Sequence, residues 1–204
     1  MAFEFTERLK KLPPYLFVEI DKAKRRARAE GRDIIDLGIG DPDESTPKEI
    51  IESLYKAACD SKNHHYPLDQ GSSVFRDRIA KWYKERFNVI LDQEKEILPL
   101  VGSKEGISHM PLAFINPGDI SLVPDPCYPP YKSGTILAGG IPYIMPLTEE
   151  NNFLPDLNKI KSETLKKAKV IYINYPNNPT ASVCEKTFFE NIVLFAKKYN
   201  LIVA

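Results

Sequence analysis

The sequence predicts an α/β protein with a largely parallel β-sheet, and three observations support this fold class. The 204 residues are 43% hydrophobic and 27% charged, which is the balance of an ordinary globular protein. Short apolar runs rich in β-branched residues recur through the second half of the chain. Segments with helical spacing separate these runs, and that alternation is typical of strands joined by helical crossovers.

The first predicted helix starts with the apolar residues 16–20 and continues through the basic stretch Lys22–Arg28. Gly31 lies where a glycine commonly follows the end of a helix. No aromatic residues interleave with the basic ones, so this stretch fits a solvated helix face better than a nucleic-acid patch.

Capping signals and apolar spacing mark further helices. Thr46 followed by Pro47 and Glu49 has the pattern of a capping box, so a helix is predicted from there to about Cys59. A third helix is predicted from Ser73. Later in the chain, apolar residues at helical spacing over 188–199 predict a helix that ends near Asn200.

Strands are predicted where apolar residues run together or alternate. A short strand is predicted over 33–40, leading into a glycine loop. Five β-prone runs follow: Ile97–Val101, Ile120–Val123, Ile141–Leu147, Lys169–Tyr175 and Leu201–Ala204. The last run reaches Ala204 without a following turn, and an exposed half-strand would leave backbone groups unpaired. We therefore expect the chain to be the N-terminal part of a longer protein.

Composition excludes several classes of protein. The 28 basic residues balance the 28 acidic ones, which argues against bulk electrostatic binding to nucleic acid. The longest apolar runs are far shorter than a membrane span requires, and the N-terminus has no apolar core of a signal peptide. Three cysteines without CxxC spacing indicate neither a disulfide framework nor a zinc site. We expect a cytoplasmic, metal-free protein.

A glycine turn follows the first of the five β-prone runs. Gly102, Ser103 and Lys104 stand between this run and a predicted helix. The start of a helix presents free N–H groups and a partial positive charge, which suit a phosphate dianion. The spacing is that of neither a P-loop nor a dinucleotide fingerprint. Taken alone, the turn is explained equally well by glycine serving only to reverse the chain.

Two other predicted strand ends carry polar or aromatic residues. Tyr128 lies in a proline-rich loop, where a stiffly held ring can stack on a planar ligand or simply pack. Asn178 follows the fourth run and offers both a donor and an acceptor, although Asn-Pro is also a common loop dipeptide. The pair His64 and His65 lacks metal-ligand spacing, so an ordinary polar loop is favoured there. A phosphate cradle, a ring and an amide at one sheet edge together favour an aromatic phosphorylated cofactor.

The ordered motifs LPPYLFVEID, DLGIGDPD, HHYPLDQG, VGSKEGISH, LVPDPCYPPY and NYPNNPT cover essentially the whole chain. In this series the chain resembles the fold-type I pyridoxal-phosphate enzymes of aminotransferase classes I and II. The resemblance implies an incomplete three-layer αβα fold with pyridoxal 5′-phosphate as cofactor. Ser103 and Lys104 would bind its phosphate, joined by Tyr66 from the partner of a homodimer. Tyr128 would stack on its ring, and Asn178 would bond the ring hydroxyl.

The same resemblance implies a substrate side formed by Tyr15, Gly40, Lys104, Tyr128 and Asn178. LPPYLF with GSKEGI points to the branch that transaminates LL-2,6-diaminopimelate with 2-oxoglutarate in lysine biosynthesis. The family's Schiff-base lysine would lie beyond Ala204, so no catalytic residue is assigned here, and this chain alone is expected to be inactive.

The implied domains are residues 1–45, an arm and part of a small α+β domain, and residues 46–204, part of a large cofactor-binding domain. Ala181 stands where the family usually has glycine, and one methyl group would be tolerated there if its φ is negative. Three alternatives remain: another amino-acid aminotransferase or C–S lyase, an aminotransferase-like effector-binding regulator, and a binding fragment without activity.

Overall fold

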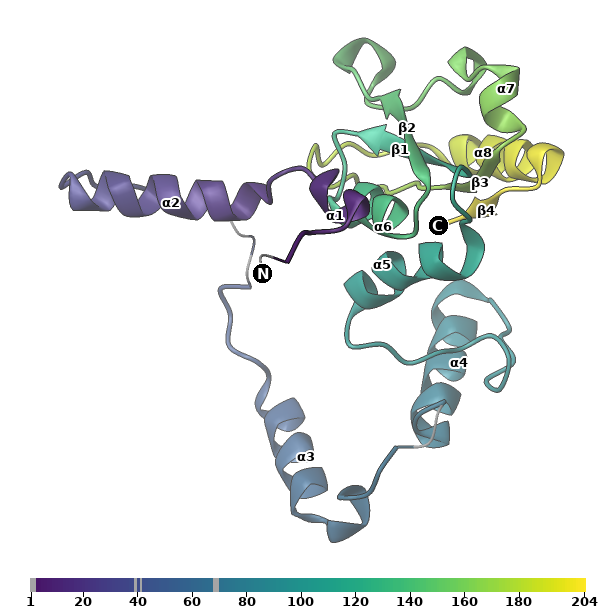
Figure 1. The fold of residues 1–204 in the computed structure, drawn as a ribbon. Coiled ribbons are helices and arrows are strands. Elements are labelled where there is room, and N and C mark those ends of the chain that lie inside the picture. Colours follow the sequence, from purple (N-terminus) through teal and green to yellow (C-terminus); the bar gives the residue numbers. More distant parts are fainter. Residues whose placement is uncertain (1–2, 39, 41, 68–69) are drawn as a thin grey trace. The chain divides into compact units, whose positions relative to one another are not determined.

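The computed structural model describes residues 3–38, 40, 42–67 and 70–204 (Figure 1). The chain forms two compact units. Unit 1 combines the N-terminal segment up to Pro13 with Leu100–Ala204, and unit 2 is Pro14–Pro99. Among the residues described, no helix is both long enough and apolar enough to cross a membrane.

Unit 1 contains a four-stranded sheet whose neighbouring strands are all parallel. The strands are β1 (Ile120–Asp125), β2 (Ile141–Pro146), β3 (Ala168–Ile171) and β4 (Ile202–Val203), in the order β2-β1-β3-β4. Helix α6 (Pro130–Leu137) joins β1 to β2, and α8 (Lys186–Tyr199) joins β3 to β4. The predicted α/β class with a parallel sheet is confirmed.

The remaining α-helices described in unit 1 are α1 (Glu7–Lys10), α5 (Ser103–Phe114) and α7 (Ser162–Leu165), and 3-10 turns lie at Glu149–Asn151 and Leu157–Lys159. The predictions for α5 and for α8 are confirmed, and α8 ends where Asn200 adopts a left-handed backbone. The short arm with α1 contacts α6, because the Arg8 guanidinium donates to the carbonyl of Leu137 over 3.1 Å. That bond satisfies a carbonyl in the last turn of α6.

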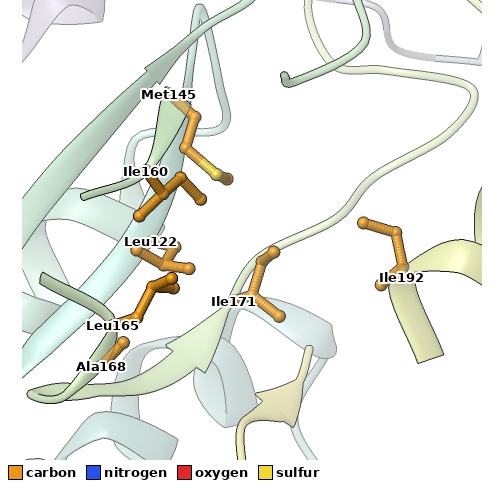
Figure 2. Close-up of a cluster of buried hydrophobic side chains, with 7 residues drawn as sticks. All are labelled: Leu122, Met145, Ile160, Leu165, Ala168, Ile171 and Ile192. Atoms are coloured by element: carbon orange, nitrogen blue, oxygen red, sulfur yellow. The ribbon is translucent and has the colours of Figure 1, made fainter. Parts of the chain in front are cut away.

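Two apolar clusters lie on opposite faces of the sheet. Successive strand residues point to opposite faces, so Leu122 and Ile171 join one cluster whereas Val123 and Val170 join the other. Figure 2 shows the first cluster, in which Ile192 of α8 and Leu165 of α7 face the strands. The second takes Tyr131 of α6, with Ile107 and Met110 of α5 packed against it. Unit 1 therefore has three layers, with α7 and α8 on one face and α5 and α6 on the other.

The two central strands, β1 and β3, are the most deeply buried strands of unit 1. Leu122, Val123, Val170 and Ile171 are all fully shielded from solvent. Burial of each such side chain contributes about 1.5–3 kcal/mol relative to exposure. This packing holds the ends of β1 and β3 in fixed positions next to each other.

Two strand predictions are wrong. Residues 33–40 form no strand where they are described, and Ile39 lies outside the described residues. Ile97–Val101 is not a strand either, and Val101 is 93% exposed. An apolar run becomes a strand only when a neighbouring strand takes up its backbone groups. Within the described part of the chain, no strand pairs with either segment.

Unit 2 is built of helices α2 (Leu16–Ala29), α3 (Lys48–Cys59) and α4 (Ser73–Phe87), with a 3-10 turn at Ser61–Asn63. All three helices were predicted, and Gly31 follows α2 with a φ of 76°. The predicted capping box is wrong. Pro47 is the N-cap of α3, with φ −51°, ψ 137° and no side-chain cap bond, so Thr46 lies one residue too early to cap the helix.

The buried centre of unit 2 is polar. Among its described side chains only Arg76 is buried, with 4% exposed. Its guanidinium donates to the carbonyls of Gln70, Gly71 and Gln93 and to both carboxylate oxygens of Glu94, over 2.7–3.0 Å. One side chain thus joins the loop before α4 to the segment that follows it.

Candidate active site

The predicted phosphate cradle lies at the start of α5. Gly102 is the N-cap with a φ of 81°, a left-handed conformation that side chains disfavour, and Ser103 is the first helical residue. Ser103 and Lys104 are both exposed. The first turn of a helix presents backbone N–H groups and a partial positive charge, so this turn can receive an anion.

Helices α5 and α6 run in the same direction, which brings their first turns to one end of unit 1. Beyond their C-terminal ends, the Gly118 amide donates to the Gly139 carbonyl over 3.3 Å. At mid-helix, a Cβ on Gly134 would lie only 3.2 Å from the Ser108 carbonyl oxygen. The two helices are thus in contact at their middles and at their C-terminal ends. The first turn of α5 therefore lies at the same end of unit 1 as the loop that leads into α6.

That loop holds Tyr128, which follows the carboxyl end of β1. The Tyr128 ring is half-buried against the second apolar cluster and lies 5.9 Å from Tyr131, edge to face at 84°. Tyr131 stacks in turn on Tyr172, with ring centroids 4.6 Å apart and planes 15° from parallel. Tyr172 follows the last residue of β3. The stacked pair therefore joins the segments that leave β1 and β3.

Asn178 lies in the loop beyond β3, on the same edge as Tyr128, because β1 and β3 are parallel neighbours. Its backbone amide donates to Oδ1 of Asn174 over 2.8 Å, and its side chain is exposed. The buried Asn177 accepts from the Thr180 hydroxyl over 2.8 Å, which stiffens the turn. The peptide between Asn178 and Pro179 is cis. The condition for tolerating the methyl group of Ala181, a negative φ, is not met, since this φ is 58°.

Side chains behind this edge are held neutral. Burial raises the pKa of Tyr172 to about 12 and the pKa of the Cys127 thiol to about 11. Burial also raises the pKa of Tyr131. At neutral pH these groups carry no charge, so none of them repels an anion at the start of α5. Helix donors, an aromatic face and an amide form a set whose chemistry fits a phosphorylated aromatic ring.

The other three predicted site residues belong to unit 2. Tyr15 precedes the first residue of α2, and its ring lies 5.5 Å from that of Phe17. Gly40 is exposed in a segment without regular structure, and Tyr66 is 98% exposed after the 3-10 turn. Of the motifs quoted for these residues, Ile39, Asp41, Leu68 and Asp69 lie outside the described residues. The roles of Tyr15, Gly40 and Tyr66 stay predictions.

The paired histidines have no metal-site geometry where the structure describes them. A ring nitrogen of His64, Nε2, lies 2.8 Å from the carbonyl of Ala58, which occupies it in a local hydrogen bond. Among the described residues, no three His, Cys, Asp or Glu side chains gather as metal ligands.

Sequence reasoning missed two features of this edge. The stacking of Tyr131 on Tyr172 depends on how α6 packs against the end of β3, which no local pattern reveals. Glu105, in the first turn of α5, accepts a hydrogen bond from the Val101 amide over 2.7 Å. An acidic residue at the third position of a helix was the available signal for Glu105.

Comparison with known proteins identifies the family. The family model for aminotransferase class I and II matches residues 32–204. The chain is 56% identical over 202 residues to LL-diaminopimelate aminotransferase of Aquifex aeolicus, covering 99% of this chain and 52% of that protein. Its identity to the enzyme of the same name from Syntrophobacter fumaroxidans is 54% over 203 residues, with 100% and 52% covered.

A solved structure has the same architecture. Substrate-bound BacF from Bacillus subtilis superposes with a TM-score of 0.91 at 37% identity, covering 99% of this chain and 51% of that one. The chain thus spans about half the length of the relatives it matches. Because the family model matches 32–204 and the fold agrees, this chain belongs to the class I and II aminotransferase family.

Proposed function

We propose that the whole protein is a pyridoxal-phosphate-dependent aminotransferase that transfers an amino group between LL-2,6-diaminopimelate and 2-oxoglutarate in lysine biosynthesis. The observation that carries the proposal is the gathering of the α5 first turn, Tyr128 and the Asn178 loop at one sheet edge. The choice of substrate is supported by relatives at 50–56% identity that bear the name LL-diaminopimelate aminotransferase.

Four residues of unit 1 would hold the cofactor. Ser103 and Lys104 would donate to its phosphate from the start of α5, where the helix dipole favours a dianion. Tyr128 would fix the plane of the ring by stacking, and Asn178 would donate its amide to the ring hydroxyl. The cofactor, when bound, acts as the electron sink for the reaction, so these residues contribute binding, orientation and electrostatic tuning.

The remaining assignments concern the substrate and the assembly. Tyr15 and Gly40 would border the substrate together with Lys104, Tyr128 and Asn178, with Gly40 near its carboxylate. Tyr66 would reach the cofactor phosphate of the partner in a homodimer. We also propose a cytoplasmic location. In the whole protein, residues 1–45 would form an arm and part of a small domain, and residues 46–204 would form part of the large cofactor-binding domain.

Substrate profiling of the whole protein tests the proposed reaction. With 2-oxoglutarate as acceptor, LL-2,6-diaminopimelate should give the highest kcat/KM among amino donors, with glutamate as product. A preference for another amino acid would contradict the substrate. Release of a thiol from a sulfur-containing amino acid, without glutamate formation, would identify a C–S lyase instead. Tight effector binding without turnover of any donor would favour the regulatory alternative.

Cofactor titration of variants tests the residue roles. Tyr128→Ala and Asn178→Ala should each raise the dissociation constant of pyridoxal phosphate about tenfold or more, because a stacking or ring-hydroxyl contact is lost. Ser103→Asp should raise this dissociation constant further, because it places a negative charge beside the phosphate. Asn158→Ala, in an exposed turn at the 3-10 segment Leu157–Lys159, is the matched control. Equal affinities in all four variants would discredit the assigned site.

A further inference from the structure

An acidic side chain in the first turn of α5 forms a hydrogen bond with the backbone just before the helix. Oε2 of Glu105 accepts a hydrogen bond from the Val101 amide over 2.7 Å. The Glu105 amide donates in the opposite direction, to the Gly102 carbonyl over 3.2 Å. These two bonds enclose Gly102, Ser103 and Lys104, so the main chain of the proposed phosphate cradle lies inside a closed turn.

The bond differs from ordinary helix capping. In a capping box the side chain at the third helical position reaches the amide of the N-cap residue, and the N-cap side chain returns the bond. Here the N-cap is Gly102, which has no side chain, and Glu105 reaches one residue further to Val101. Because the Glu105 carboxylate accepts from Val101, this bond does not use the amides of Gly102 and Ser103 at the helix start.

The charge of Glu105 opposes the proposed ligand. A carboxylate within the first turn adds a negative charge close to a phosphate dianion, and like charges at short range repel. On charge alone the residue would weaken phosphate binding. A fixed turn, however, avoids the conformational cost of ordering the donors when the anion arrives.

We propose that Glu105 is a positioning residue that holds Ser103 and Lys104 in the conformation that receives the cofactor phosphate, an inference that rests on the proposed function. Its hydrogen bond to Val101 outweighs its charge. Removal of the bond should therefore weaken phosphate recognition even though a negative charge is removed with it.

The experiment compares pyridoxal phosphate with pyridoxal in the whole protein. The ratio of their dissociation constants isolates the contribution of the phosphate from that of the ring. Glu105→Ala should lower this preference for the phosphorylated form about tenfold, equivalent to about 1.4 kcal/mol, with the affinity for pyridoxal unchanged. Glu105→Gln keeps an oxygen that can accept from Val101, so its preference should equal or exceed that of the wild type.

Two further variants complete the design. Glu105→Asp keeps the charge but is one methylene too short to span the turn, so it should lower the preference at least as much as Glu105→Ala. It provides the result if the alanine variant does not fold. Glu96→Ala is the matched control, because Oε2 of Glu96 accepts from the Asp92 amide over the same 2.7 Å and the same four-residue separation, outside the cradle. Its preference should equal that of the wild type.

The outcomes separate the two claims. An unchanged or increased preference in Glu105→Ala would overturn the positioning role and leave the cofactor site intact. Loss of preference in Glu105→Gln to the level of Glu105→Ala would also overturn it, because the hydrogen bond would then not be the cause. A wild-type protein that binds both compounds equally would contradict the proposed function itself.

Discussion

At the scale of single residues, Ala181 combines a side chain with a backbone conformation that favours glycine. Its φ of 58° places the methyl group close to the following carbonyl oxygen. Ala181→Gly should therefore raise the free energy of unfolding by about 1 kcal/mol, net of the greater freedom of glycine in the unfolded chain. Thermal and urea denaturation measure the change.

The same substitution in a helix provides the control for Ala181. Ala113 is exposed in α5, where alanine is favoured and glycine costs stability. Ala113→Gly should thus lower the free energy of unfolding. Destabilisation by both substitutions would show that the Ala181 backbone is not strained.

Cys127 is a second residue whose chemistry is set by its surroundings. Burial, with a smaller contribution from Asp125, raises its pKa from 9.0 to about 11. Since the thiolate is the reactive form, Cys127 should react with iodoacetamide about a hundredfold more slowly at pH 8 than an unshifted thiol. Its rate should keep rising with pH until about 11.

Mass spectrometry of the alkylated protein follows Cys127 separately from Cys59 and Cys184. In urea the shift should disappear and the rate should level off near pH 9, because burial is its first cause. A plateau near pH 9 in the folded protein would contradict the burial of this thiol.

At the scale of elements, strand β2 is an outer strand of the described sheet, and its unpaired edge offers few backbone N–H donors. The amides of Ile141 and Leu147 both donate toward the β1 side. Hydrogen bonding alternates along a parallel strand, so Pro142, Ile144 and Pro146 face outward. Two of these three residues are prolines, and only Ile144 offers an N–H there. Prolines at such positions discourage another strand from pairing with the edge.

Restoring the donors should allow β2 to recruit a second chain. Pro142→Val with Pro146→Val places two amides and two β-branched side chains on the edge, so self-association should increase with protein concentration. Analytical ultracentrifugation measures it. Pro47→Val, at the exposed start of α3, adds similar apolar surface without a strand edge and should leave the association state unchanged. Equal behaviour of both variants would contradict the edge interpretation.

The sequence predicts elements well when their evidence is local or when burial is deep. Helix α8 has apolar residues at helical spacing, and β1 and β3 read as continuous apolar runs because both of their faces are covered. Ile97–Val101 has the same local pattern but lacks a neighbouring strand in the described chain. The capping box at Thr46 fails for a related reason, because the backbone at Pro47 determines where α3 begins.

The candidate site is only partly predictable for the same physical reasons. Tyr128 and Asn178 follow β1 and β3, and the topology of parallel strands takes such residues to one edge. Ser103 follows a run that forms no strand, so its place depends on the packing of α5 against α6. The φ of Ala181 and the bond from Val101 to Glu105 depend on the folded backbone, which local sequence patterns do not specify.

At the scale of the whole molecule, the two units differ in how they are held together. Unit 1 contains both apolar clusters and the edge formed by α5, Tyr128 and Asn178. Unit 2 contains Tyr15, Gly40 and Tyr66, and its described interior is organised around the hydrogen bonds of Arg76. Ser103, Lys104, Tyr128 and Asn178, the residues of this chain that we propose to hold the cofactor, therefore all belong to the unit that contains the apolar clusters.

A crystal structure of the whole protein with pyridoxal phosphate tests the proposed cofactor site most directly. The phosphate should lie within hydrogen-bond distance of Ser103 and Lys104 at the first turn of α5. The ring should stack on Tyr128, with the Asn178 amide at its hydroxyl. A cofactor bound away from the carboxyl edge of β1 and β3, or a phosphate held by other residues, would contradict the proposed cofactor site.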